Sequence, residues 1–259
     1  MIRGIYASAA ALASHSARQE LLASNLANAT TLGYRGLRAC ATGYPALLRA
    51  ADDSAGSWPK AGLRAAPGQL SATGAPDLWG PGCTVSAASL DPSPGPLETT
   101  GNPLDLALVG DGLFVCQTPR GVRYTRAGRF QLDTGGRLVT PSGYAVLGAR
   151  GPIVLPPGEV QVREDGQVSV DGRPVDRLRL VTFPDGAQLV PEGQGYLSCS
   201  GPEQPAAGLR VVQGAVEHSN VMPATELSRM IQGLRLYEAN ISAMRAQDQS
   251  LARLLSAIQ

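Results

Sequence analysis

The chain has 259 residues, and its 22 Lys and Arg against 21 Asp and Glu give a formal net charge of +1. This length suffices for one large domain or two modest ones with a real core. The balanced charge excludes the electrostatic footprint of a nucleic-acid or acidic-membrane partner. Aromatic residues make up only 5% of the chain, which argues against a surface that stacks sugars or bases. No apolar run reaches the roughly 18 residues that a membrane-spanning helix needs.

Residues 3–28 predict one amphipathic helix, whose large apolar residues share a face: Ile5, Leu12, Leu22 and Leu26. Arg3 followed by an apolar run that ends in Ala-x-Ala at 11–13 also raises a signal-peptide reading. We favour an uncleaved helix, because the run is mostly Ala and Ser and the helical pattern continues past the supposed cut. The turn formers of 28–33 end the helix, and Gly33 can adopt a positive φ there.

Residues 31–96 predict an extended, irregular linker segment rich in Arg, Ala, Gly, Pro and Ser, with a short hairpin near 63–70. Such a segment can stay disordered until it meets a partner. From residue 97 the pattern changes to short apolar runs separated by Asp-Gly and Gly-Gly turns, such as Asp165-Gly166 and Asp171-Gly172. This alternation predicts an all-β domain of short antiparallel strands over 97–213.

The last stretch, 224–259, repeats apolar residues in heptads and predicts a long helix. The a positions are Leu227, Leu234, Ile241, Asp248 and Leu255, and the d positions are Met230, Tyr237, Met244, Leu251 and Ile258. Gly233 is the only helix breaker within the repeat. Asp248, the single polar seam residue, either sets register, contacts a basic residue of a neighbour, or faces water.

The predicted fold class is therefore mainly β with α. It has a central all-β domain and long N- and C-terminal helices that pack as an antiparallel coiled-coil-like pair. The expected division is a split helical domain formed by residues 1–30 and 214–259, the linker 31–96 and the β domain 97–213. Each apolar stripe needs the other helix, a second copy of the chain, or both.

Catalytic chemistry finds little support in the sequence. His15 and His218 lack any metal-binding or catalytic spacing, and the chain has no nucleophile elbow, phosphate loop or dinucleotide fingerprint. Asp165 and Asp171 precede glycines as hairpin turns require, and with Asp176 they lack the glutamate of a calcium loop. The scattered cysteines predict incidental thiols, although a disulfide stays open: Cys40, Cys83, Cys116 and Cys199. We expect no enzyme activity, no catalytic residue, no metal ion and no cofactor.

Three motifs, taken in order along the chain, resemble the bacterial flagellar basal-body rod protein family. The first combines Met1–Tyr6 with Asn25–Arg35, and the second runs through Gly101–Ala107, Gly110–Phe114 and Tyr124–Gly128. The third combines Gly214, Glu217–Val221, Met230–Ile231 and Arg235–Asn240. Two positions depart from the family pattern. Thr31-Leu32-Gly33-Tyr34 replaces its usual turn, and Met222-Pro223 replaces its usual Asn.

The resemblance implies a structural subunit that is exported by the flagellar type III apparatus without a cleaved signal peptide. It implies polymerisation, with self and with other rod and hook proteins, into the rod that crosses the periplasm. The terminal helices would form the inner tube, and the assembly residues expected there are Ile5, Leu12, Leu22, Asn25, Leu26, Asn28, Leu227, Met230, Leu234, Tyr237, Ile241, Met244, Leu251 and Leu255. Gly151–Pro156 favours a proximal-rod, FlgF-like subunit. A distal-rod, FlgG-like subunit is the alternative, and a secreted β-rich adhesin or a β-rich periplasmic enzyme is a more distant one.

Overall fold

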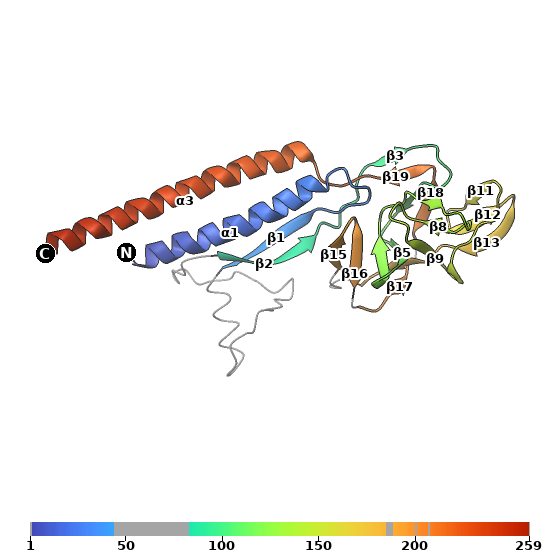
Figure 1. Cartoon of the computed structure of the whole chain (residues 1–259), viewed down its shortest axis with the longest axis horizontal. Coiled ribbons are helices and arrows are strands. Elements are labelled where there is room, and N and C mark those ends of the chain that lie inside the picture. The colour runs from blue at the N-terminus through green and yellow to red at the C-terminus, as the bar shows by residue number, and fades with distance from the viewer. Residues whose placement is uncertain (1, 44–82, 185–188, 200, 207, 259) are drawn as a thin grey trace, which may run out of the picture. The chain divides into compact units, whose positions relative to one another are not determined.

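The computed structural model describes residues 2–43, 83–184, 189–199, 201–206 and 208–258 (Figure 1). The chain forms two compact units. Unit 1 comprises Met1–Ala27, Leu37–Asp91 and Pro223–Gln259, and unit 2 comprises Asn28–Gly36 and Pro92–Met222. The chain therefore passes between the units four times. The hairpin expected near residues 63–70 lies outside the described residues.

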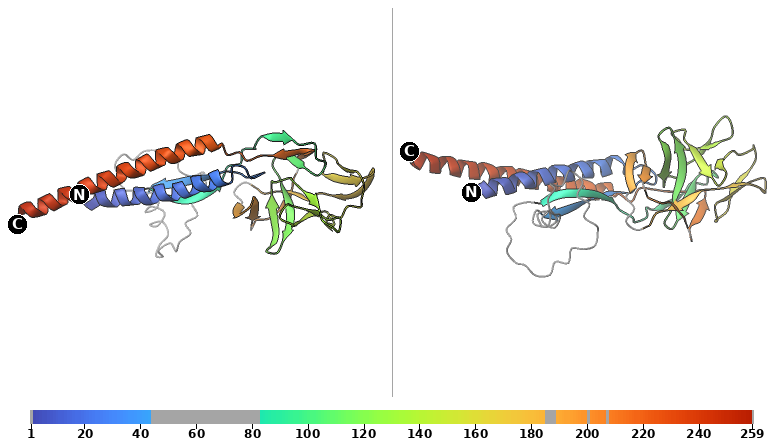
Figure 2. Two further views of the ribbon diagram at one scale, coloured as in Figure 1. Left: turned by 45° about the horizontal axis from the view of Figure 1, so that its top comes forward. Right: turned by 90° about the horizontal axis from the view of Figure 1, so that it is seen from below.

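Unit 1 contains helix α1 (Ile2–Ala27), helix α3 (Pro223–Ile258), and strands β1 (Leu37–Gly43) and β2 (Cys83–Leu90). β1 and β2 pair antiparallel, and the sequence pattern had not indicated this hairpin. α1 contacts both strands of the hairpin and also α3, as the views in Figure 2 show. Pro223 suits the first turn of α3, because a proline there lacks only a donor that the helix does not use.

The expected fold class, with terminal helices packed as an antiparallel coiled-coil-like pair, is wrong. The described chain has two helices and a β-rich central region, and the expected heptad seam is not buried. Leu227 and Leu234, two of its a positions, are 45% and 51% exposed. The covered stripe of α3 instead combines d positions, the residue before each a position, and one a position, Ile241: Glu226, Met230, Gly233, Tyr237, Asn240, Ile241, Met244 and Gln247.

A polar contact explains this shift of the covered stripe. The Gln19 side-chain amide of α1 donates to the Met230 carbonyl oxygen over 2.9 Å. A Cβ atom at Gly233 would lie 2.3 Å from that amide nitrogen. Gly233 thus leaves room for the Gln19 amide against α3, whereas Leu227 and Leu234 stay exposed.

Unit 2 is built from short strands, and every pairing between its described strands is antiparallel. A ten-stranded sheet has the order β15-β16-β6-β5-β9-β8-β7, with β10 beside β9, β14 beside β5 and β17 beside β14; smaller sheets are β11-β12-β13, β18-β4 and β19-β3. The strands are β3 (Leu97–Thr99), β4 (Leu106–Val109), β5 (Leu113–Thr118), β6 (Gly121–Thr125), β7 (Gln131–Leu132), β8 (Leu138–Val139), β9 (Ala145–Gly148), β10 (Gly151–Pro152), β11 (Val160–Val162), β12 (Gln167–Val170), β13 (Arg173–Arg177), β14 (Leu180–Thr182), β15 (Leu189–Gly193), β16 (Tyr196–Cys199), β17 (Gln204–Pro205), β18 (Arg210–Gln213) and β19 (Ala215–Glu217).

The Asp-Gly turns and the apolar runs between them shape this unit. Asp171 (φ 49°) and Gly172 (φ 76°) form the two-residue turn between β12 and β13, since left-handed backbone at both positions suits a tight hairpin. The core gathers side chains from most of the sheets. Phe114 is fully buried and meets Phe130 edge-to-face, with the ring centroids 5.0 Å apart.

The segment that precedes α3 completes unit 2. β18 pairs with β4, and β19 pairs with β3. Between these strands Gly214 donates to the Asp105 carbonyl oxygen over 2.7 Å and accepts from the Thr100 and Gly101 amides. Residues separated by more than a hundred positions are thereby fixed side by side.

Candidate functional site

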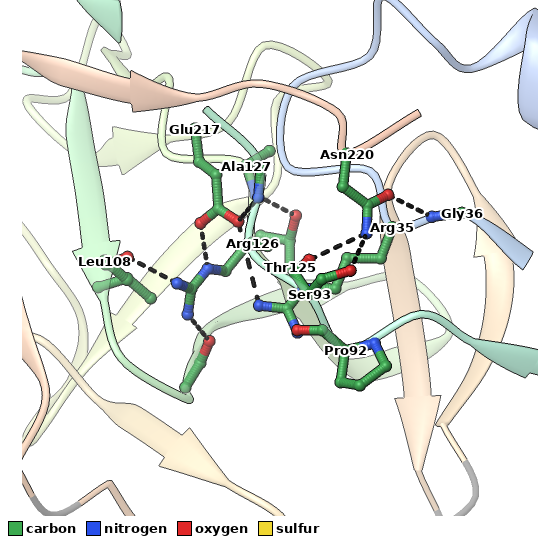
Figure 3. Close-up of polar contacts among 12 residues, drawn as sticks. Arg35, Gly36, Pro92, Ser93, Leu108, Thr125, Arg126, Ala127, Glu217 and Asn220 are labelled. Atoms are coloured by element: carbon green, nitrogen blue, oxygen red, sulfur yellow. Dashed lines mark hydrogen bonds and ion pairs between the residues drawn. The ribbon is translucent and has the colours of Figure 1, made fainter. Parts of the chain in front are cut away.

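A buried ion pair lies where the three sequence motifs meet in unit 2 (Figure 3). Arg126 follows β6, Glu217 ends β19, and both side chains are only 2% exposed. Arg126 Nε donates to Glu217 Oε2. The other two guanidinium nitrogens donate to the Gly112 and Leu108 carbonyl oxygens, each over 2.6 Å. Because a buried charge without a partner costs several kcal/mol, each member of the pair depends on the other.

Glu217 also connects the pair to two segments from the first half of the chain. Its Oε1 atom accepts from the Gly95 amide over 3.1 Å, and Arg35 Nη2 lies 4.0 Å from it. Its backbone oxygen accepts from the Gly33 amide over 2.8 Å. One residue near the end of unit 2 therefore binds the segment that follows α1 and the segment that precedes β3.

Gly33 is required at this place by its surroundings as well as by its backbone. Its φ is +63°, and a Cβ atom there would lie 2.3 Å from the Ala127 nitrogen and 2.4 Å from the Arg126 carbonyl carbon. Both obstacles are backbone atoms, which can be displaced only at a cost in free energy. Only glycine lets residues 28–36 lie this close to the strand end that carries Arg126.

Asn220 and Arg35 form the outer part of the site (Figure 3). Asn220 Oδ1 accepts from the Gly36 amide over 2.8 Å, and its Nδ2 donates to the Ser93 carbonyl oxygen over 2.9 Å. The Asn220 amide donates to the Tyr34 carbonyl oxygen over 3.3 Å. Arg35 Nη1 donates to the Pro92 carbonyl oxygen over 2.6 Å. The polar atoms of the site thus hold chain segments together.

Burial raises the pKa of a buried thiol and of a tyrosine hydroxyl elsewhere in unit 2. Burial raises the pKa of the Cys116 thiol from 9.0 to about 12, so a reactive thiolate is disfavoured at neutral pH. Burial and a hydrogen bond to Glu203 raise the pKa of Tyr124. Among the described residues, no group of three or more His, Cys, Asp or Glu side chains is placed to hold a metal ion. The hydrogen bonds described above favour a site that stabilises the fold over a site that carries out a chemical reaction.

Comparison with known proteins places these segments in one family. Residues 107–170 match the flagellar hook protein FlgE/F/G D1 domain, and residues 212–257 match the C-terminal domain of the flagellar basal body rod FlgEFG proteins. The flagellar basal-body rod protein FlgF of Escherichia coli is 32% identical over 98% of this chain and 97% of its own length. The chain belongs to the flagellar basal-body rod protein family. FlgF of Mesorhizobium japonicum is 32% identical over 88% of this chain and 86% of its own length, and FlgG of Bacillus subtilis is 28% identical over 99% of both.

Membership of the rod family makes the chain a structural subunit of the flagellar rod, as the sequence motifs predicted. Its buried ion pair joins the two matched regions, because Arg126 lies in the first and Glu217 in the second. The motif residues therefore stabilise the fold of the rod subunit.

The assembly residues predicted for the rod subunit fall in different surroundings. In α1, Leu22 and Asn25 are buried and Leu12 and Leu26 are half-buried. Asn25 uses its side-chain amide twice, accepting from the Leu37 amide over 2.8 Å and donating to the Leu37 carbonyl oxygen over 2.9 Å. Asn28 belongs to unit 2, where its carbonyl oxygen accepts from the Thr31 amide. Asn25 thus holds the start of β1 beside the end of α1.

In α3 the predicted residues separate into two sets. Met230, Tyr237, Ile241 and Met244 are half-buried, whereas Leu227, Leu234 and Asp248 are exposed. The side chains of Ile5, Leu251 and Leu255 lie outside the described residues. Sequence analysis missed Gln19, Arg126, Glu217 and the double role of Asn220, because their partners are distant in sequence and show no periodic signal.

Proposed function

We propose that this rod subunit joins its neighbours through the outward apolar face of α3. The observation that carries the proposal is the exposure of Leu227, Ile231 and Leu234, at 45%, 53% and 51%. These residues are spaced i, i+4 and i+7, so they lie on one side of the helix. Burying a large aliphatic side chain contributes about 1.5–3 kcal/mol, so a subunit interface is a favourable place for all three.

The remaining assembly residues are proposed to act from the same helices. Those in α1 and the d positions of α3 would keep each helix in place within unit 1, and the outward residues of α3 would meet another copy or another rod or hook protein. The division into a split helical domain of 1–30 and 214–259, a linker of 31–96 and a β domain of 97–213 stays a prediction about layers of the assembled rod. A head-to-tail interface whose rotation does not close generates a helical filament, which suits a rod.

The proximal rod is the proposed position, on the basis of the FlgF-like stretch Gly151–Pro156. Relatives named FlgF and FlgG both align along most of this chain, so their identities do not separate the two positions. The stretch begins with β10, which pairs with β9. A cryo-EM map of purified basal bodies would decide: density for this chain in the distal rod would contradict the proximal position.

Export through the flagellar type III apparatus, without a cleaved signal peptide, to a periplasmic position in the rod is also proposed. α1 continues unbroken from Ile2 to Ala27, across the Ala-x-Ala stretch at residues 11–13. The described residues include no helix long and apolar enough to cross a membrane. We propose a purely structural role with no enzymatic activity, since the site described above holds chain segments together.

Removal of residues 224–259 tests the role of the terminal helix. We expect the truncated chain to retain β structure by circular dichroism, since β18 and β19 remain, and to be absent from purified basal bodies. Normal rod assembly by the truncated chain would overturn the proposal. Mass spectrometry of the full-length protein from basal bodies tests export at the same time, because an N-terminus beginning after residue 13 would show cleavage.

A further inference from the structure

All four passages of the chain between the units are tied together within unit 2. The residues next to the passages are Asn28, Gly36, Pro92 and Met222. When the chain segments that join two domains are not bonded to one another, force can enter a domain through each segment separately. In unit 2, hydrogen bonds join these connecting segments to one another next to the passages.

Asn220 makes most of these ties. Its side chain binds Gly36, the last residue before one passage, and Ser93, the second residue after another. Its own backbone amide binds the Tyr34 carbonyl oxygen, and Asn220 lies two residues before the passage at Met222. Residues 28–34 are joined in turn by hydrogen bonds from the Thr31 amide to Asn28 and from the Tyr34 amide to Thr31.

A side-chain amide suits this task because it accepts and donates in one plane. Oδ1 accepts from the Gly36 amide while Nδ2 donates to the Ser93 carbonyl oxygen, so one residue holds two chain segments at a fixed spacing. Arg35 adds a second tie between the same segments through the Pro92 carbonyl oxygen. Unit 1, taken by itself, shows the same arrangement, since Asn25 binds Leu37 and Arg38 pairs with Asp91.

We infer that Asn220 is a positioning residue whose hydrogen bonds hold the connecting segments together, so that force carried along the chain enters unit 2 at one place. The transmission of force through this point rests on the proposed function, because a rod subunit must carry torque between its neighbours. The holding together of the segments is a property of the free subunit. Asn220→Ala should free the connecting segments from one another without unfolding the sheets of unit 2, because Asn220 is not part of their hydrophobic core.

Amide hydrogen exchange of the full chain, measured by NMR, tests whether Asn220 holds these segments together. In Asn220→Ala we expect the Gly36 amide to exchange at least about fivefold faster, the factor that the loss of one hydrogen bond of ordinary net strength gives. The amides shared by β5 and β6 should keep their rates. Asn102→Ala is the matched control, because the Asn102 side chain bonds Asp105 and Leu104 within its own turn.

The variant Asn220→Asp separates the two halves of the tie. Its carboxylate still accepts from Gly36 but cannot donate to Ser93, so we expect a protected Gly36 amide together with faster proteolytic cleavage near residues 91–93. An unchanged Gly36 amide in Asn220→Ala would overturn the inference. Equal loss of protection throughout unit 2 would also overturn it, because Asn220 would then be a general stabiliser.

Swimming under load tests the functional half. Cells whose chromosomal copy carries Asn220→Ala should lose more speed in a viscous medium than in a dilute one, relative to cells with Asn102→Ala. Equal losses in both media would overturn the role in load transfer. Absence of the wild-type chain from purified basal bodies would contradict the proposed rod function. The hydrogen-exchange measurement tests the role of Asn220 in the free subunit independently of that outcome.

Discussion

The two units distribute their exposed apolar side chains differently. Unit 1 gathers Leu227, Ile231 and Leu234 on one side of α3, whereas exposed large hydrophobic residues of unit 2, such as Leu97, Leu132 and Val190, lie on separate strands. Unit 2 buries a complete ion pair, Arg126 with Glu217, and satisfies each nitrogen of the guanidinium. Unit 1 exposes Leu227 and Leu234 along α3 and buries Glu226, whose Oε1 pairs with Arg229 while its Oε2 has no hydrogen-bond partner among the described residues. Unit 2 resembles a finished fold, and unit 1 resembles half of an interface. The difference teaches that one chain can keep one part self-sufficient and leave another to be completed by its neighbours.

The largest effect is expected from removing the buried carboxylate of unit 2. Glu217→Ala leaves Arg126 as an uncompensated buried charge, and the free energy of unfolding should fall by about 3–5 kcal/mol. Urea denaturation followed by circular dichroism measures this change. Glu98→Ala is the control, because Glu98 pairs with His218 at the surface and should cost less than about 1 kcal/mol.

The double variant Arg126→Met with Glu217→Leu sharpens the same point. Replacing both charges by apolar groups removes the uncompensated charge, so the double variant should be more stable than Glu217→Ala. If Glu217→Ala were as stable as Glu98→Ala, the self-sufficiency of unit 2 would not depend on this pair.

A smaller loss is expected from a methyl group at Gly33. The left-handed backbone costs a non-glycine residue roughly 1–2 kcal/mol. The contact of the added Cβ with the Ala127 nitrogen, at 2.3 Å, adds a backbone displacement. The total for Gly33→Ala should therefore be at least about 2–3 kcal/mol. Differential scanning calorimetry can compare it with Gly143→Ala, where φ is +82° and an added Cβ would meet none of the described residues within 4 Å apart from its chain neighbours. Equal melting temperatures would contradict the close approach.

The smallest effect on stability is expected in unit 1, with the largest effect on assembly. Leu227→Gln with Leu234→Gln changes exposed positions, so the unfolding free energy should stay within about 0.5 kcal/mol. Recovery of the chain in purified basal bodies should nevertheless fall sharply. Val190→Gln is the control, since Val190 in unit 2 is 52% exposed and carries no proposed contact. Normal incorporation of the double variant would show that this face of α3 is not an interface.

Local signals in the sequence predicted the short-strand, turn-rich character of unit 2. The Asp171-Gly172 turn has the left-handed backbone at both residues that the Asp-Gly pair indicated. Both long helices also lie where the apolar periodicity placed them. These features depend on neighbouring residues, and neighbouring residues are what a single sequence displays.

The covered face of α3 and the candidate site depended on distant partners. Heptad analysis selected Leu227 and Leu234, but contact with α1 is made through Gly233, a residue that looked like a helix breaker. Arg126 and Glu217 are 91 positions apart, and neither carries a local mark of burial. The β1–β2 hairpin was missed because its strands are separated by the low-complexity stretch between residues 43 and 83.

That hairpin has a consequence for how this chain can vary in length. β1 and β2 pair from Leu37 and Leu90 to Gly43 and Cys83, so the intervening chain starts and ends at neighbouring strand ends. The entropy of closing a loop rises only slowly with its length, by about 0.6 kcal/mol for each doubling. A connection of a different length can therefore leave the register of β1 and β2 unchanged, because the pairs from Leu37 with Leu90 to Gly43 with Cys83 fix that register.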